Sequence, residues 1–227
     1  ISLGAFNVQA AAVSFDFGAL AEGNEGTWDS RTGTGTGGAG GTFNGATDTW
    51  TIGTLGVTAD GFNTDLTNST VTEAYLDAPI TINGNVMPAG LGACSTVVGT
   101  ACGTPSDDNT GIAGDAGGSV REGFELTFTE GVSLVELVFR DRDHNPLTTG
   151  NILINGNVFD IATGDLAALS YSNVWTFGRA MTSNGGVDFY LNTANVNAVP
   201  LPAAVWLFGS ALLGVFGVAR RSSQIKA

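Results

Sequence analysis

The sequence predicts an all-β protein, an antiparallel β-sandwich of jelly-roll type followed by one C-terminal transmembrane helix. Short runs alternate apolar with polar residues, and turn-forming residues separate these runs. No segment of residues 13–198 keeps the 3.6-residue apolar period of an amphipathic helix. The chain closes with a long uncharged apolar run. A barrel is the alternative way to arrange the same strands.

Apolar residues at every second position mark three of the expected strands. They lie at residues 13–17, 124–128 and 187–191, where large apolar side chains alternate with polar ones. This period is typical of strands with one face in the core. Residues 134–139 are apolar almost throughout, which predicts a strand covered on both faces.

Two Asn-Gly-Asn triplets predict β-hairpins. Asn83-Gly84-Asn85 lies between Ile/Val-rich runs, and Asn155-Gly156-Asn157 repeats the pattern. Asn-Gly suits the two central positions of a tight hairpin turn, where the backbone needs positive φ. We therefore expect each triplet to connect two antiparallel strands.

The remaining segments set the predicted domain organisation. Residues 32–45 and 88–118 are rich in Gly and Thr and are expected to be loops. The chain is expected to comprise a signal-peptide remnant at 1–12, a β-sandwich domain at 13–191, a linker at 192–199, and a membrane-anchoring tail at 200–227.

Between Pro202 and Arg220 lie 17 uncharged residues. As a helix they reach about 25 Å, close to the thickness of a bilayer core. The basic residues Arg220, Arg221 and Lys226 all follow the run, which places the C-terminus in the cytoplasm and the preceding domain outside. A buried core helix is the alternative, but this run is apolar on every face.

The order of features in this tail resembles the PEP-CTERM sorting signal of Gram-negative bacteria. A proline motif precedes a membrane helix and an arginine pair, although Leu201 stands where the family name implies glutamate. The resemblance covers about an eighth of the chain. It implies recognition by an exosortase, processing near the prolines, and delivery to the cell surface or to the extracellular matrix of exopolysaccharide and biofilm. The residues that carry the resemblance are Val199, Pro200, Leu201, Pro202, Trp206, Gly214, Arg220 and Arg221.

The N-terminal residues also indicate export. Ala10 and Ala12 have the spacing of small residues that signal peptidase accepts. An ordinary first strand or helix of the domain is the alternative.

The part of the chain before Pro200 is strongly acidic. It has five basic and 21 acidic residues, a net charge of −16. Such a surface repels phosphate backbones, which excludes nucleic acid as an expected partner, and attracts cations such as Ca²⁺.

Cys94 and Cys102 are the only cysteines, with seven residues between them. Outside the cytoplasm such a pair predicts a disulfide that closes a short loop. A metal site is the alternative, but His144 is the sole histidine and soft ligands are few.

The densest polar cluster is Arg140-Asp141-Arg142-Asp143-His144-Asn145. A catalytic interpretation uses His144 as a base that Asp141 or Asp143 orients. A solvated turn with Arg–Asp pairs is the simpler interpretation, and we expect no enzyme, because no nucleophile motif accompanies the histidine.

Acidic and amide side chains also suggest a structural calcium ion. Ca²⁺ takes six to eight oxygen ligands, which alternating Asp and Asn residues and loop carbonyls can supply. The candidate ligands are Asp107, Asp108, Asp141, Asp143 and Asn145.

These observations predict an exported, non-catalytic surface or matrix protein. The alternative is a carbohydrate-binding module for matrix polysaccharide, in which aromatic side chains form a stacking platform. A hydrolase using Glu122 and Glu125 is disfavoured, because these residues fall on opposite faces of a strand. The candidate aromatic residues are Trp28, Trp50, Trp175, Tyr75, Tyr171 and Tyr190.

Overall fold

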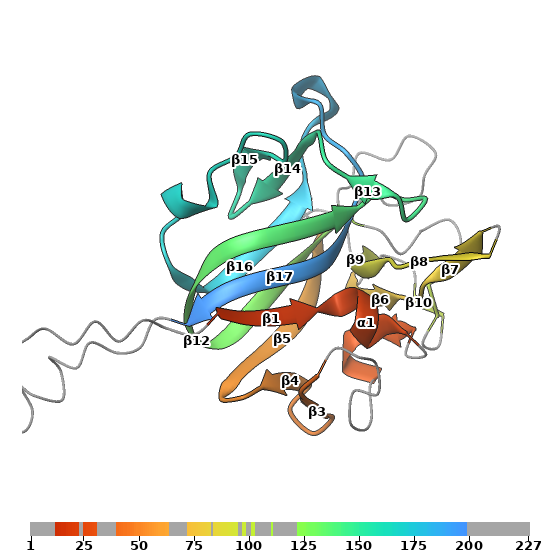
Figure 1. Cartoon of the computed structure of the whole chain (residues 1–227), viewed down its shortest axis with the longest axis vertical. Helices are drawn as coiled ribbons and strands as arrows, with labels where there is room; N and C mark the ends of the chain where they lie inside the picture. The colour runs from red at the N-terminus through yellow and green to blue at the C-terminus, as the bar shows by residue number, and fades with distance from the viewer. Residues whose placement is uncertain are drawn as a thin grey trace, which may run out of the picture. The chain divides into compact units, whose positions relative to one another are not determined.

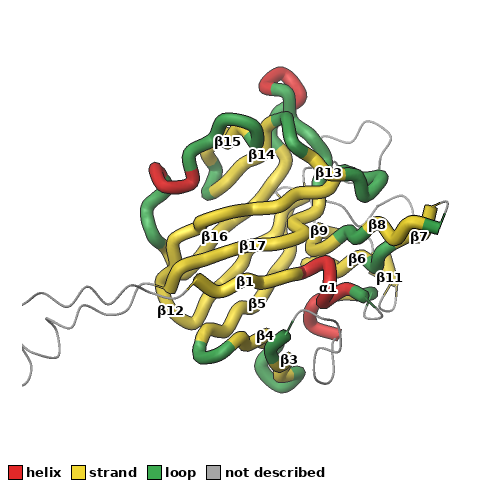
Figure 2. Tube along the Cα trace, viewed as in Figure 1, coloured by secondary structure: helices red, strands yellow, loops and turns green. Residues whose placement is uncertain are grey.

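Antiparallel strands dominate the computed structural model of the chain, shown in Figures 1 and 2. Residues 11–198 group into one compact unit. The structure describes residues 12–22, 25–30, 40–63, 72–82, 84–94, 97–98, 101–102, 110 and 122–198.

One hydrogen-bonded sheet contains 13 of the described strands. Its main path is β15 (Asn157–Asp160), β14 (Asn151–Ile154), β16 (Ser172–Arg179), β12 (Glu122–Arg140), β17 (Tyr190–Ala198), β9 (Gly90–Cys94), β6 (Glu73–Asp77) and β2 (Gly26–Thr27). Strands that branch from this path are β1 (Ala12–Asp16), β3 (Thr42–Asn44), β4 (Thr49–Ile52), β5 (Leu55–Asn63) and β13 (Pro146–Leu147).

Short elements complete the described fold. The paired strands are β7 (Ile80–Ile82) with β8 (Asn85–Met87) and β10 (Val97–Val98) with β11 (Ala101–Cys102). The helical turns are α1 (Phe17–Ala21), η1 (Trp28–Ser30), η2 (Leu166–Ala168) and η3 (Thr182–Asn184).

The 19-residue strand β12 organises the sheet. Its first part pairs with β5 along one edge and with β16 along the other, whereas its second part pairs with β17. The register shifts between Thr127 and Val132, and such irregularities bend a strand. The sheet consequently curls into a half-barrel (Figure 2).

The predicted all-β antiparallel class is confirmed, but the arrangement of the strands differs from the expected one. A sandwich stacks two separate sheets. Here the long strand β12 continues through the bend, so the described strands on both sides belong to one curled sheet. This arrangement is closer to the barrel alternative.

Aromatic side chains fill the core of the curled sheet. Phe15 contacts Trp50 edge-on at a centroid distance of 5.2 Å, and Phe124 stacks on Phe177 at the same distance. Such pairs contribute about 0.5–1.5 kcal/mol each beyond their burial. Further buried rings in these contacts belong to Phe17, Trp28, Phe43, Phe128, Phe139 and Phe189.

Both predicted Asn-Gly hairpins are confirmed. Ile80 pairs with Met87 across the first turn, and Ile154 pairs with Asn157 across the second. Asn155 and Gly156 have φ values of 49° and 75°, as a type I′ turn requires.

The expected loop at 88–118 contains a central strand instead. β9 is buried along its whole length and connects β17 to β6. Its sequence, Gly-Leu-Gly-Ala-Cys, shows no alternation of apolar and polar residues that would indicate a strand. The glycines let the backbone approach the neighbouring strand closely. At Gly90 a Cβ atom would lie 2.3 Å from the carbonyl oxygen of Leu191. Of the expected loop at 32–45, residues 32–39 lie outside the described residues, and β3 occupies Thr42–Asn44.

The predicted linker at 192–199 is wrong as far as Ala198, because β17 continues to that residue. Buried Ala194 and Val196 alternate with half-buried Asn195 and Asn197, so small apolar residues supply the core face. At the other end, the predicted signal remnant does not extend to Ala12, because β1 begins there and Ala12 pairs with Asn197.

Two expected strands also differ in detail. Phe17 begins helix α1 instead of ending a strand, and β17 begins at Tyr190. Residues 134–139 are not covered on both faces, since Val135 is 49% exposed beside a register shift. The register shift lies between Leu134 and Glu136, so Val135 is skipped in the pairing with β17.

Candidate functional site

The sole histidine lies in a tight turn between β12 and β13. Asp141 Oδ1 accepts hydrogen bonds from the backbone N–H groups of Asp143 and Asn145 at 2.9 and 2.8 Å. His144 N donates to the Asp141 carbonyl at 2.9 Å, and His144 adopts a φ of 64°. The aspartate thus fixes the turn and holds His144 in the left-handed conformation.

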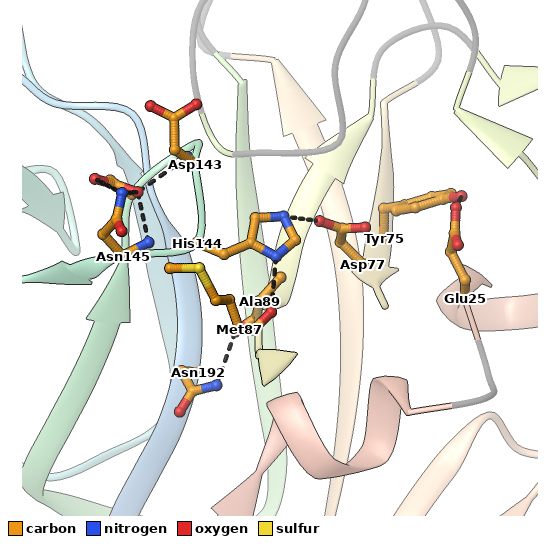
Figure 3. Close-up of polar contacts among 10 residues, drawn as sticks. Glu25, Tyr75, Asp77, Met87, Ala89, Asp143, His144, Asn145 and Asn192 are labelled. Carbon is orange, nitrogen blue, oxygen red and sulfur yellow. Dashed lines mark hydrogen bonds and ion pairs between the residues drawn. The ribbon is translucent and has the colours of Figure 1, made fainter. Parts of the chain in front are cut away.

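The imidazole of His144 is buried among three strands (Figure 3). Its Nε2 lies 2.8 Å from Asp77 Oδ2 at the end of β6, and its Nδ1 lies 3.1 Å from the Met87 carbonyl oxygen at the end of β8. The ring of Tyr190 packs against it edge-on at 5.3 Å. The contacts therefore connect the β12–β13 turn to β6, β8 and β17.

The geometry of this pair favours a structural role over a catalytic one. Both ring nitrogens face oxygen atoms that only accept, so the charged imidazolium satisfies both contacts at once. A general base needs a nitrogen that can reach a substrate, and only 4% of His144 is exposed.

The predicted environment of His144 requires correction. The sequence predicts a solvated turn, but the histidine is buried, and the carboxylate on its ring is Asp77 rather than Asp141 or Asp143. Asp77 was missed because it lies far away in the sequence, without any local motif that links it to the histidine. Asp143 and Asn145 are exposed, as expected for that turn.

Neighbouring polar contacts strengthen the same part of the sheet. Asn192 is buried in β17 and donates through Nδ2 to the Ala89 carbonyl at 2.8 Å. Tyr75 donates through its hydroxyl to Glu25 Oε1 at 3.3 Å. Figure 3 shows these contacts beside the Asp77–His144 pair.

An acidic group occupies another part of the sheet. Burial raises the pKa of the Glu73 carboxyl above its usual range, and the negative charges of Asp29 and Asp60 raise this pKa further. Like charges disfavour the ionised form of Glu73. These three residues come from β6, η1 and β5.

The structure gives the predicted calcium ligands separate roles. Asp141 is engaged with backbone N–H groups, and Asn145 Nδ2 contacts its carboxylate at 3.3 Å. Within the described part of the chain, no group of three or more His, Cys, Asp or Glu side chains gathers for a metal. Asp107 and Asp108 lie outside the described residues, so calcium binding stays a prediction.

The predicted disulfide is present. Cys94 and Cys102 are bonded, with Cα atoms 5.8 Å apart, and the bond connects the end of β9 to β11. Both sulfur atoms are therefore committed, and the alternative of a cysteine metal site does not hold. In the chain-entropy model, closure of such a short loop contributes about 2–3 kcal/mol.

The aromatic candidates separate into buried residues and one exposed ring. Tyr171, which precedes β16, is 65% exposed. The other five are buried, so they supply core packing instead of a stacking platform: Trp28, Trp50, Trp175, Tyr75 and Tyr190.

A surface pocket lies beside β12, β17 and η2. Its volume is about 550 Å³. The lining residues are Ser133, Leu134, Val135, Gly164, Asp165, Leu166, Ala167, Leu169 and Asn197. Polar side chains and leucines thus meet in one concavity, which is the usual composition of a small binding site.

The predicted sorting signal, including Pro200, Pro202, Arg220 and Arg221, lies outside the described residues. Among the helices that the structure describes, none is long and apolar enough to cross a membrane.

Comparison of the chain with protein-family models, with curated proteins and with solved structures finds no match.

Proposed function

We propose that the chain is an exported, non-catalytic protein of the cell surface or of the extracellular polysaccharide matrix. An exosortase recognises its C-terminal signal, and the membrane helix retains the precursor until processing. The observation that carries this proposal is the order of the tail: Val199-Pro200-Leu201-Pro202, an uncharged run of 17 residues, and Arg220-Arg221.

Three features of the described domain support export without catalysis. The Cys94–Cys102 disulfide suits an oxidising compartment outside the cytoplasm. The net charge of −16 before Pro200 suits a soluble extracellular surface. His144 has both ring nitrogens engaged, which leaves it poorly suited to proton transfer.

The proposal retains the one transmembrane helix that the sequence predicts after the β domain. Sheet pairing of the described domain continues to Ala198, directly before the proline motif in the sequence.

The arginine pair provides the direct test. In the native host, Arg220→Ala with Arg221→Ala should leave uncut precursor in the membrane, because the motif loses the charges that orient it. Mass spectrometry of the released wild-type protein should find a C-terminus near Pro200–Pro202. Surface delivery of the double variant at the wild-type level contradicts the sorting proposal.

The Lys226→Ala variant is the matched control, since it removes a positive charge outside the arginine pair and should be processed normally. Hydrolysis of a matrix polysaccharide by the wild-type protein contradicts the non-catalytic part of the proposal.

Carbohydrate binding is a second candidate function of the exported domain. One observation favours it: Tyr171 is exposed and lies on the same side of β12 as polar residues that line the pocket. Aromatic rings with polar neighbours suit sugar rings, which have apolar C–H faces and hydroxyl edges.

A further inference from the structure

A polar strip follows one face of β12 and β17. Ser133 pairs with Asn197, and Glu136 pairs with Asn195, whose Nδ2 donates to Glu136 Oε2 at 2.7 Å. Val196, the one residue between Asn195 and Asn197, is buried in the core, and alternate residues of a strand share a face. The four polar side chains therefore lie on the face directed away from the core.

Tyr171 lies at the end of this strip. A Cβ atom on Gly131 would be 2.7 Å from two carbons of the Tyr171 ring, so the missing side chain makes room for the ring. Val132 is buried, which places Gly131 and Ser133 together on the opposite face. The exposed ring and the polar strip thus share one surface.

The pocket connects the strip to the turn around η2. Ser133 and Asn197 contribute polar groups from the sheet, and Leu166 and Leu169 contribute apolar surface from the turn. Asp165, also in the lining, accepts through Oδ1 from Ala167 N at 2.9 Å, which fixes its carboxylate. Within the lining given by the described residues there is no positively charged side chain.

We propose that this surface binds a neutral polysaccharide chain, with one sugar ring against Tyr171 and the next in the pocket. Amide and hydroxyl side chains both donate and accept, as sugar hydroxyls do, and the Asp165 carboxylate accepts from them. The net charge of −16 before Pro200 disfavours anionic polymers. The inference deepens the carbohydrate-binding candidate and is independent of sorting by the tail.

The test measures binding by the full-length chain in a detergent without a sugar headgroup, since a glycosidic detergent would compete for the site. Isothermal titration is carried out with a soluble glucan, mannan and galactan, and with alginate as the anionic polymer. At least one neutral polymer should bind. Tyr171→Ala should raise the dissociation constant for that polymer by about tenfold, the effect of losing roughly 1.4 kcal/mol of binding free energy. Tyr171→Phe should retain binding.

Val86→Ala is the matched control, because Val86 is 64% exposed on β8 and lies outside the pocket lining. It should bind like the wild type, and all variants should show the wild-type melting temperature. Asn197→Ala, from inside the pocket, should also weaken binding.

Several outcomes overturn the inference. They are absence of binding to all three neutral polymers, unchanged affinity of Tyr171→Ala, and equal weakening by Val86→Ala. Preferential binding of alginate contradicts the neutral class of ligand. Because processing of the tail is measured separately in cells, failure here leaves the sorting proposal standing, and failure of processing leaves this binding site standing.

Discussion

At the scale of single residues, the contacts of His144 show how a buried polar group connects distant segments. Its ring nitrogens contact a carboxylate on β6 and a carbonyl at the end of β8. Removal of one member of a buried charged pair leaves the other member without compensation, which costs more than the pair itself contributes. The contribution of the pair to stability is therefore measurable by substitution.

Asp77→Ala should lower the free energy of unfolding by about 3 kcal/mol, because it leaves the imidazolium buried without its counter-charge. Denaturant unfolding provides the measurement. Asp143→Ala is the control, since Asp143 is exposed in the same turn and should change stability by less than about 0.5 kcal/mol. A double variant with His144→Leu should lose less than the sum of the single losses; full additivity would show that the two residues do not interact.

Glu73 should make the domain less stable at neutral pH than in mild acid. The pKa of its carboxyl is raised in the folded state, so the folded protein holds the proton to higher pH than the unfolded chain. The stabilising contribution is complete below the unfolded pKa and is lost as pH rises through the folded pKa. Glu73→Gln should therefore stabilise the protein at about pH 7, with a gain that vanishes near pH 4.

The measurement for Glu73 is denaturant unfolding across this pH range, with Glu130→Gln on the exposed part of β12 as the control. An equal gain in the free energy of unfolding of Glu73→Gln at both ends of this pH range would show that the charge of Glu73 does not cause the destabilisation.

At the scale of elements, β9 depends on close approach to β17. Gly90 has a φ of +143°, and its missing side chain leaves room for the backbone around Leu191. A residue with a Cβ atom is strained in that conformation and collides with the neighbouring strand. A glycine here is thus a packing requirement of the central sheet.

Gly90→Ala should consequently destabilise the protein by at least about 2 kcal/mol, as expected for strain combined with overpacking. Gly178→Ala in β16 is the matched control, because its nearest neighbour would be 3.8 Å from the added Cβ. Thermal unfolding of both variants gives the comparison. Similar melting temperatures for the two would contradict close packing at β9.

Local chemistry determines which elements could be predicted from the sequence. The hairpin at Asn155-Gly156 was predictable because two adjacent residues determine its turn. β9 was not predictable by alternation, since its small residues are buried by neighbours that the sequence does not reveal. The end of β17 was missed for a similar reason: Asn195 and Asn197 resemble a polar linker, although Ala194 and Val196 face the core.

At the scale of the whole molecule, the all-β fold class is easier to predict from the sequence than the arrangement of the strands. Alternation in residues 124–128 predicts strands, but it does not say that one strand of 19 residues continues through a bend. The candidate sites divide in the same way. The Cys94–Cys102 pair followed from two cysteines close in sequence, whereas Asp77 beside His144 and Tyr171 over Gly131 depend on how the sheet curls.

The continuation of β17 to Ala198 has a mechanical consequence. β17 lies between β1 and the second part of β12, and its last residue pairs with Val132. A pull transmitted along β17 from the following residues acts parallel to the strand, whereas its hydrogen bonds run perpendicular to it. The load is therefore shared in shear by two ladders at once instead of opening one hydrogen bond at a time, so β17 should resist extraction from its C-terminal end.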